Sequence, residues 1–203
     1  MKLKNYFDSS FISKKHLDLG CGFKIKNPYG APNLYGIDVH NNEKNNIGNY
    51  KKANLILDDI PFPDNFFSSV SAYDFIEHIP RQLFIHDKMK YPFINLMNEI
   101  YRVLEPGGLF FASTPVYPSA ETFVDPTHVN FITESTHRYF TNNDVLGNHY
   151  GFNGNFKVKH ILKIQPILME KEFSNKLVMF IKWYKRKLRG KFTHLIWELE
   201  AVK

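Results

Sequence analysis

The sequence predicts an α/β fold organised around a mostly parallel sheet. Short apolar runs that suit buried strands recur through the first 115 residues, separated by connecting segments. The first run ends in a Gly-Cys-Gly turn, and the second ends in an aspartate. A segment whose apolar residues recur at helical spacing precedes the fifth run. Strands that alternate with helices and loops in this way are typical of parallel sheets.

Five early strands, one helix and two late strands are expected. The early strands are expected at residues 16–19, 34–39, 47–53, 69–73 and 109–113. A helix is expected over Tyr91–Leu104, and Pro106-Gly107-Gly108 ends it. The late strands are expected at 156–164 and 195–202, where they form an antiparallel pair at the edge of the sheet.

The connection between the first two strands is short. Only residues 23–33 lie between them, and this segment contains two prolines and a glycine. Proline removes a helical hydrogen bond and clashes with the preceding turn, so a full crossover helix does not fit. The sequence therefore predicts an α/β sheet with a truncated first crossover helix.

Length and composition fit a single domain. The chain has 203 residues, of which 43% are hydrophobic and 23% charged, and this excludes disorder as the main state. We interpret residues 1–203 as one domain, with 1–15 as an N-terminal extension and 170–192 as a basic amphipathic insertion between the late strands. The single cysteine, Cys21, excludes an internal disulfide and a cysteine-based zinc site, and it favours a reducing, cytoplasmic location.

The positive charge is concentrated in the C-terminal quarter. Residues 1–156 hold 14 basic and 16 acidic side chains, whereas 157–203 hold 12 and 4, which gives −2 and +8. A uniformly basic nucleic-acid binder is therefore disfavoured. Residues 174–191 predict an amphipathic basic helix. This helix either packs on the sheet with its basic face in water, or contacts an anionic substrate or a membrane surface.

The turn after the first strand is typical of a nucleotide-binding site. Gly20 and Gly22 let the backbone approach a ligand closely, and Asp38 at the end of the second strand can accept hydrogen bonds from both hydroxyls of a ribose. A dinucleotide places its pyrophosphate at the N-terminus of a following helix, which is missing here. The missing helix therefore disfavours NAD. It does not disfavour S-adenosylmethionine, which has no phosphate. The alternative is a tight turn with a solvent-facing aspartate.

Four motifs carry a resemblance to a known family. They are LDLGCG at 17–22, YGIDV at 35–39, IPFPDNFFSSVSAYDFIEHI at 60–79 and EIYRVLEPGGLFFASTP at 99–115. Over about residues 16–140, the sequence resembles class I S-adenosylmethionine-dependent methyltransferases of the methyltransferase type 11 kind. The resemblance implies a Rossmann-like sheet of seven strands in the order 3-2-1-4-5-7-6, S-adenosylmethionine as cofactor, and methyl transfer (EC 2.1.1.-) as activity.

The resemblance also implies which residues hold the cofactor. The methionine part is expected beside the glycine turn, the ribose at Asp38, the adenine against Val39 and near Asn54, and the sulfonium beside Tyr73. Asp58 or Asp59 is the alternative to Asn54 at the adenine. The implied cofactor-binding residues are Asp18, Gly20, Cys21, Gly22, Asp38, Val39, Asn54, Leu55, Tyr73 and Asp74. They fall at the carboxyl ends of strands, where ligands of such sheets bind.

Candidate catalytic residues follow the fourth and fifth strands. In the loop 114–130, His128 is the expected general base and Asp125 its orienting partner. Alternatively, Asp125 caps the turn before His128, and His128 only packs beneath the loop. His78, in the Glu-His pair after the fourth strand, is the second candidate base, with a structural hydrogen bond as its alternative.

The predicted function is methyl transfer to a small-molecule or glycan-like acceptor, at oxygen. Two alternatives are a cofactor-binding partner subunit without catalysis and an NAD-dependent oxidoreductase. The expected location is cytoplasmic, and peripheral to the inner membrane face if 174–191 bind lipid. No metal site is expected, because the remaining histidines lack ligand spacing and are interpreted as surface or edge residues: His137, His149, His160 and His194.

Overall fold

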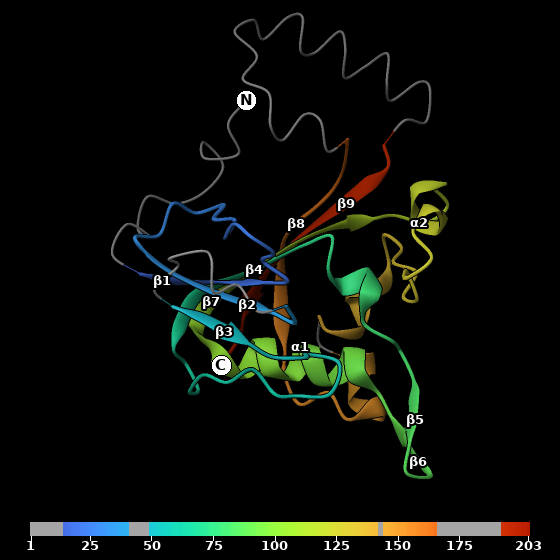
Figure 1. The fold of residues 1–203 in the computed structure, drawn as a ribbon, viewed down its shortest axis with the longest axis horizontal. Coiled ribbons are helices and arrows are strands. Elements are labelled where there is room, and N and C mark those ends of the chain that lie inside the picture. The colour runs from blue at the N-terminus through green and yellow to red at the C-terminus, as the bar shows by residue number, and fades with distance from the viewer. Residues whose placement is uncertain (1–13, 41–48, 142–143, 166–191) are drawn as a thin grey trace, which may run out of the picture.

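The computed structural model describes residues 14–40, 49–141, 144–165 and 192–203 (Figure 1). A seven-stranded sheet lies at its centre, in the order β3-β2-β1-β4-β7-β9-β8. Counted over the sheet strands alone, this is the expected order 3-2-1-4-5-7-6. The strands are β1 (Lys15–Leu19), β2 (Asn33–Asp38), β3 (Tyr50–Lys52), β4 (Phe67–Tyr73), β7 (Leu104–Pro115), β8 (Phe156–Ile164) and β9 (His194–Ala201).

The sheet is parallel except at one strand. The pairs β1–β2, β1–β4, β2–β3 and β4–β7 are parallel, whereas β9 runs antiparallel to both β7 and β8. The expected antiparallel late pair is confirmed. The carboxyl ends of β1, β2 and β4 therefore meet at one edge of the sheet, where ligands of open α/β sheets bind.

Helix α1 (Pro92–Val103) covers one face of the sheet (Figure 1). Its buried face includes Leu96, Met97 and Ile100, which join the largest core cluster with side chains from β1, β4 and β7. Pro92 begins the helix, where the missing N–H costs nothing. Strand β7 begins at Leu104 and is longer than expected, because the chain passes from helix to strand before the Pro-Gly-Gly turn.

The second face of the sheet is covered in part by the short connection after β1. No helix forms in the described segment 20–32, which confirms the truncated crossover. Tyr29 from this segment packs instead in a smaller core cluster with Phe111 and Ile196. Its hydroxyl donates to Glu198 Oε1 at 3.1 Å, so the buried phenol keeps a partner.

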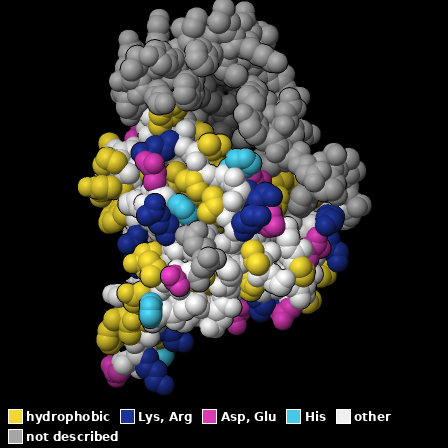
Figure 2. Space-filling model, turned by 180° about the vertical axis from the view of Figure 1, so that it is seen from behind, with side chains coloured by type: hydrophobic (Ala, Val, Ile, Leu, Met, Phe, Trp, Pro, Cys, Tyr) yellow, Lys and Arg dark blue, Asp and Glu magenta, His cyan; other side chains and the backbone are white. Residues whose placement is uncertain are grey.

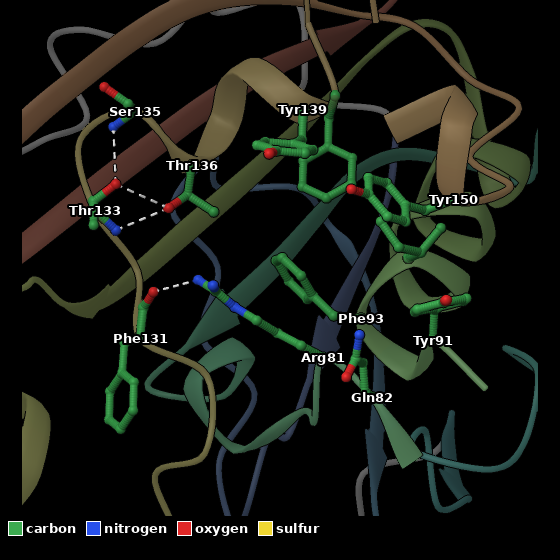
Figure 3. Close-up of a pocket in the computed structure, with 12 residues that line it drawn as sticks. Arg81, Gln82, Tyr91, Phe93, Phe131, Thr133, Ser135, Thr136, Tyr139 and Tyr150 are labelled. Carbon is green, nitrogen blue, oxygen red and sulfur yellow. Dashed lines mark hydrogen bonds between the residues drawn. The ribbon is translucent and has the colours of Figure 1, made fainter. Parts of the chain in front are cut away.

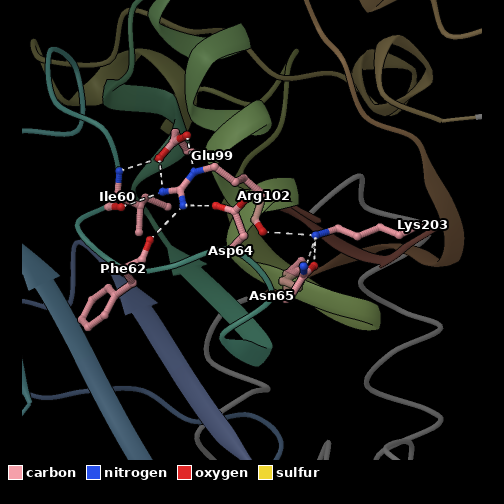
Figure 4. A network of polar contacts seen from close by, with 8 residues as sticks. Ile60, Phe62, Asp64, Asn65, Glu99, Arg102 and Lys203 are labelled. Carbon is pink, nitrogen blue, oxygen red and sulfur yellow. Dashed lines mark hydrogen bonds and ion pairs between the residues drawn. The ribbon is translucent and has the colours of Figure 1, made fainter.

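An ion-pair network ties α1 to the loop before β4 (Figure 4). The guanidinium of Arg102 donates to Glu99 at 2.6 and 2.8 Å and to Asp64 Oδ1 at 2.7 Å. It also donates to the carbonyls of Ile60 and Phe62. Bidentate pairing of this kind is stronger than a single surface ion pair, so the network fixes the position of the 60–64 loop against the helix.

The remaining described elements are short. They are η3 (Ile76–His78), β5 (Leu83–Ile85), β6 (Lys88–Lys90), α2 (Glu121–Val124), η4 (Thr136–Tyr139) and η5 (Leu146–Tyr150). The β5–β6 hairpin was not predicted. Its turn residues His86 and Asp87 both have positive φ, at 47° and 59°. Turns of this type usually contain Asn-Gly, so a His-Asp turn gives no strong signal in the sequence.

The described surface carries both signs of charge. On the face seen in Figure 2, lysines and arginines are interspersed with acidic side chains. The expected basic helix at 174–191, nearly all of the 170–192 insertion, and residues 1–13 of the N-terminal extension lie outside the described residues. No helix in the described part of the chain combines the length and apolarity needed to cross a bilayer.

Candidate active site

The glycine turn after β1 requires glycine at both positions. Gly20 has a φ of +62° and Gly22 a φ of +54°, conformations that side chains rarely adopt. A Cβ added at Gly20 would also lie 2.4 Å from the ring of Phe75. The turn is held against β2, since Cys21 N donates to Ile37 O at 3.1 Å and Gly22 N donates to Asp38 Oδ2 at 2.9 Å. Its backbone is thus presented at the carboxyl edge of the sheet.

Asp18 supports this turn from inside the protein. The residue is only 1% exposed, and its two oxygens accept from Ser71 Oγ at 2.6 Å and from Lys26 N at 2.7 Å. Burial raises the pKa of Asp18 to about 7, although both hydrogen bonds favour its ionised form. The carboxyl group expected near the methionine part therefore braces the segment that follows the turn.

His16 continues the same buried network. Its Nε2 donates to Ser71 Oγ and Lys26 O, each at 3.0 Å, and its Nδ1 lies 2.7 Å from Ser69 Oγ. Burial lowers the pKa of His16 to about 4, so the imidazole is neutral near pH 7. The turn is thus supported by a chain of three polar side chains beneath it.

Cys21 packs inward from the turn. Its side chain is buried, and a Cβ added at Gly36 would lie 2.7 Å from Sγ. Burial, together with the charges of Asp18 and Asp38, raises the pKa of Cys21 to about 12. The thiol is therefore neutral and fills the space beside β2, and what the residue offers a ligand is its backbone.

Asp38 and Val39 lie at the open edge beyond β2. The carboxylate of Asp38 accepts from Gly22 N at 2.9 Å and from His40 N at 3.0 Å, which orients it while each oxygen keeps a second lone pair. Val39 is half exposed, and so presents an apolar surface next to that carboxylate. This pairing of an oriented acid and an apolar side chain fits a nucleoside such as that of S-adenosylmethionine.

Asn54 and Leu55 are engaged within their own turn. Asn54 Oδ1 accepts from Ile56 N at 3.2 Å, and Asn54 N donates to Asp58 Oδ2 at 3.0 Å. Leu55 is buried in the main core. An adenine contact from Asn54 would thus use an oxygen that already accepts one hydrogen bond.

Tyr73 and Asp74 end β4 as expected, and Asp74 has an additional partner. Asp74 Oδ1 lies 3.2 Å from Nε2 of His194, which is 9% exposed at the start of β9. The interpretation of His194 as a surface or edge residue is therefore wrong with respect to exposure. Its pairing with a distant aspartate left no local signal in the sequence. Tyr73 packs on Phe111 with ring centroids 5.1 Å apart.

The three candidate catalytic residues come together just beyond β4. The rings of His78 and His128 are 4.8 Å apart, centroid to centroid. His78 Nδ1 lies 2.9 Å from the hydroxyl of Thr127, which donates to Asp125 Oδ1 at 2.7 Å. His128 Nδ1 donates to the carbonyl of Thr122 at 3.1 Å. Both rings therefore carry their proton on Nδ1 when neutral, and their Nε2 atoms can accept a proton or bind a cation.

The expected pairing of Asp125 with His128 is wrong. Asp125 caps the turn that follows it, since Thr127 N also donates to Asp125 Oδ1 at 2.8 Å, as the alternative interpretation held. The carboxylate acts through Thr127 on His78 instead. The hydrogen bonds to Thr127 lower the pKa of the exposed Asp125 carboxyl, so it is ionised at neutral pH.

Glu77 belongs to this cluster although it was not a candidate. It is 1% exposed, Oε2 accepts from Thr114 Oγ1 at 2.9 Å, and Oε1 has no hydrogen-bond partner among the described residues. Burial raises the pKa of Glu77 to about 7. Its carbonyl accepts from the amides of Val129 and Asn130, which fastens the loop after β7 over the end of β4. The Glu-His pair in the sequence was the available signal.

A cavity of about 590 Å³ is lined by residues that follow each of these two segments in the sequence, together with residues from the start of α1 and from η5 (Figure 3). Arg81, three residues beyond His78, donates to Asn130 Oδ1 at 2.7 Å and to the carbonyl of Phe131. Asn130 Nδ2 in turn donates to Ile76 O at 3.1 Å. The cavity walls are largely aromatic and include Tyr91, Tyr139 and Tyr150, with the hydroxyls of Thr133, Ser135 and Thr136 at one side.

Comparisons with known proteins agree with the fold and with the glycine turn motif. The sequence profile of the family described as Methyltransferase domain matches residues 17–112. No protein of curated function matches the sequence significantly. Among solved structures, an S-adenosylmethionine-dependent methyltransferase from Archaeoglobus fulgidus is similar, with a TM-score of 0.58 and 16% identity over 98% of this chain and 90% of that one.

Two further structures share the fold. A methyltransferase from Mesorhizobium loti that depends on S-adenosylmethionine has a TM-score of 0.57 and 14% identity, over 94% of this chain and 92% of its own. A complex of the Haloferax volcanii Trm112 methyltransferase activator with a methyltransferase gives a TM-score of 0.59 and 14% identity, over 94% of this chain and 84% of that one. At these identities the likeness establishes the fold. The family match over residues 17–112, together with the glycine turn, supports a class I S-adenosylmethionine-dependent methyltransferase with S-adenosylmethionine as its cofactor.

Proposed function

We propose that this protein transfers the methyl group of S-adenosylmethionine to a hydroxyl of a small, glycan-like acceptor. The observation that carries the proposal is the cluster of Glu77, His78 and His128 directly beyond β4. None of the three lines the aromatic cavity, whose walls include Arg81 and Phe131, close to them in the sequence. A hydroxyl is a weak nucleophile and must lose its proton during methyl transfer, which requires an acceptor for the proton at that point.

The cofactor is assigned to the carboxyl edge of β1, β2 and β4. Asp38 would hold the ribose hydroxyls and Val39 the adenine, while the backbone of the glycine turn would face the methionine part. When bound, S-adenosylmethionine supplies an electrophilic methyl group on a sulfonium. Tyr73 and Asp74 end the strand nearest to the histidine cluster, so we place the methyl group beside them.

The protein's own residues orient the acceptor and take its proton. Either imidazole offers an unprotonated Nε2, and His78 is held by Thr127 and Asp125 in the tautomer that a general base requires. His128 is held in the same tautomer by the carbonyl of Thr122. Methyl transfer depends chiefly on positioning, and two oriented rings restrict where an acceptor oxygen can lie.

The cavity suits a sugar-like acceptor. Aromatic faces such as those of Tyr139 and Tyr150 bind the apolar faces of sugar rings, while threonine and serine hydroxyls match sugar hydroxyls. Arg81 places one positive charge at the cavity, which favours an acceptor with an anionic group. The basic segment 174–191 would attract such acceptors, or an anionic membrane surface that carries them.

The test has two parts on the full chain. Calorimetry with S-adenosylhomocysteine is expected to give one site per chain. Turnover is then measured with tritiated S-adenosylmethionine against nucleotide sugars, phosphorylated sugars and lipid-linked glycans, with nucleic acids and peptides as comparison classes. Labelled methyl ether in a glycan class supports the proposal, whereas labelling confined to nucleic acid or peptide refutes it.

A second candidate function is a partner subunit that binds the cofactor without catalysis. The absence of a helix between β1 and β2 in the described segment favours it, because that helix commonly adds contacts to a bound nucleotide. The similar Haloferax volcanii methyltransferase forms a complex with an activator protein. Stoichiometric binding of S-adenosylhomocysteine with no transfer to any acceptor class would favour this role.

A further inference from the structure

The side chains of Glu77, His78 and His128 form a group whose ligand atoms all lie within 4.8 Å of one another. We propose that these three side chains bind a divalent transition-metal cation such as Zn²⁺. The proposal rests on the proposed function only in placing the acceptor hydroxyl at this point. The cation site itself is argued from the chemistry of the three side chains.

The two histidines are arranged as metal ligands usually are. Histidines that bind metals donate their other ring N–H to a carbonyl, carboxylate or hydroxyl, which fixes the ring and its tautomer. His128 Nδ1 donates to Thr122 O, and His78 Nδ1 donates to Thr127 Oγ1, which is itself bonded to Asp125. Both Nε2 lone pairs are therefore available, and neither Nε2 has a hydrogen-bond partner among the described residues.

Glu77 provides the second, independent observation. Its carboxyl group is almost fully buried, Oε2 is bonded to Thr114, and Oε1 has no partner among the described residues. A buried polar atom without a partner is destabilising, and more so when the group is charged. A cation bound between this oxygen and the two imidazoles would remove that cost.

The ligand types select the class of cation. Two imidazoles and one carboxylate suit Zn²⁺, Co²⁺ or Fe²⁺ better than Mg²⁺ or Ca²⁺, which prefer oxygen ligands. Ligand bonds to Zn²⁺ are about 2.0–2.2 Å long, so the ligand atoms must close to roughly 3.3 Å from one another. Both histidines are only partly buried, so their rings have room for this movement.

Three protein ligands leave a coordination position for the acceptor. A catalytic Zn²⁺ with three protein ligands lowers the pKa of an oxygen bound in its open position. The acceptor hydroxyl would release its proton to solvent, and its oxygen would form a bond to the methyl carbon. The bond from that carbon to sulfur breaks, and sulfur keeps the electron pair to give S-adenosylhomocysteine. In this arrangement His78 and His128 position the cation in place of accepting the proton.

The test uses the full chain after treatment with EDTA. Calorimetry with Zn²⁺ is expected to show one tight site, and Co²⁺ is expected to give visible absorption bands of a site with nitrogen and oxygen ligands. Glu77→Gln, His78→Asn and His128→Gln should each weaken Zn²⁺ binding by at least about 100-fold. His149→Gln, in η5 and outside the cluster, is the matched control and should bind Zn²⁺ like the original chain.

Circular dichroism and S-adenosylhomocysteine affinity show whether each variant is folded. The inference is overturned if the original chain binds no stoichiometric Zn²⁺, or if His149→Gln weakens binding as much as His128→Gln does. Failure of the cation site leaves glycan methylation measurable on its own, with the imidazoles as bases. Tight Zn²⁺ binding without any methyl transfer would instead refute the proposed function and keep the cation site.

Discussion

The imidazole of His78 donates from Nδ1 to the hydroxyl of Thr127, 2.9 Å away. That hydroxyl in turn donates a hydrogen bond to Asp125 Oδ1 at 2.7 Å. An ionised carboxylate thus sets the tautomer of a histidine through one intervening hydroxyl, and both catalytic proposals depend on the Nε2 lone pair that results. The relationship joins residues from two separate loops, and it can be tested at each link.

Replacing Thr127 by valine should remove this control. His78 then has no partner at Nδ1, and we expect its neutral form to populate both tautomers, as nitrogen-15 NMR of the ring would show. Loss of one hydrogen bond of about 1 kcal/mol should lower turnover about fivefold. Thr127→Ser should restore both properties, and an unchanged His78 spectrum in Thr127→Val would contradict the assignment.

Replacing Asp38 even by asparagine should weaken cofactor binding. Both of its oxygens accept from backbone amides, so in Asp38→Asn the side-chain NH₂ must face one of the N–H donors of Gly22 or His40. The turn loses a charged hydrogen bond of about 1.5–3 kcal/mol, and the ribose loses its acceptor. We expect S-adenosylhomocysteine affinity, measured by calorimetry, to fall about 10- to 100-fold. Asp87→Asn in the β5–β6 hairpin is the control and should bind normally.

Alanine substitutions at Gly20 and Gly22 distinguish the backbone cost of a positive φ from the cost of a steric clash. Alanine at Gly22 (φ +54°) meets no neighbouring atom within 4 Å, so Gly22→Ala should lower the free energy of unfolding only by the backbone cost, about 1–2 kcal/mol. Gly20→Ala has a similar φ and also meets the Phe75 ring at 2.4 Å, so it should cost more. Urea denaturation measures both. Phe75→Leu added to Gly20→Ala should recover part of the difference, and equal costs at the two glycines would refute the contact.

The hydroxyl of Ser71 should contribute more to the free energy of unfolding as pH rises. The pKa of Asp18 in the folded protein, about 7, lies above its ordinary value of 3.8, so the stability contributed by the protonated group is full below pH 4 and is lost as pH passes 7. Above pH 7 the buried carboxylate needs the hydroxyl of Ser71. Ser71→Ala should therefore lower the free energy of unfolding by about 1–3 kcal/mol at pH 8 and by less at pH 5.5.

Ser68→Ala is the matched control for that measurement. Its hydroxyl donates to the carbonyl of Lys15 at 2.8 Å, which does not titrate. The loss of stability in Ser68→Ala should be the same at both pH values. A Ser71→Ala effect that is equally independent of pH would show that Asp18 does not change its ionisation in this range.

Much of the fold could be predicted because its signals are local. The glycine turn follows a short apolar strand, and the helix Pro92–Val103 has apolar residues at helical spacing. Each of the two late strands is also marked by its own apolar residues. The β5–β6 hairpin was missed because His86 and Asp87 adopt positive φ without glycine. The strand that begins at Leu104 was expected five residues later, because a proline and two glycines hide its start.

The sequence by itself determined the α/β class and the truncated first crossover, which depend on periodicity and turn residues, and its resemblance to class I methyltransferases implied the strand order and the cofactor. Only the tertiary structure decided which side chains act together. It joined Asp125 to His78 through Thr127, paired His194 with Asp74, and buried Glu77 with one oxygen that has no hydrogen-bond partner in the described part of the chain. The physical reason is that hydrogen bonds and desolvation depend on distances between elements far apart in sequence, and residue spacing along the chain does not encode those distances.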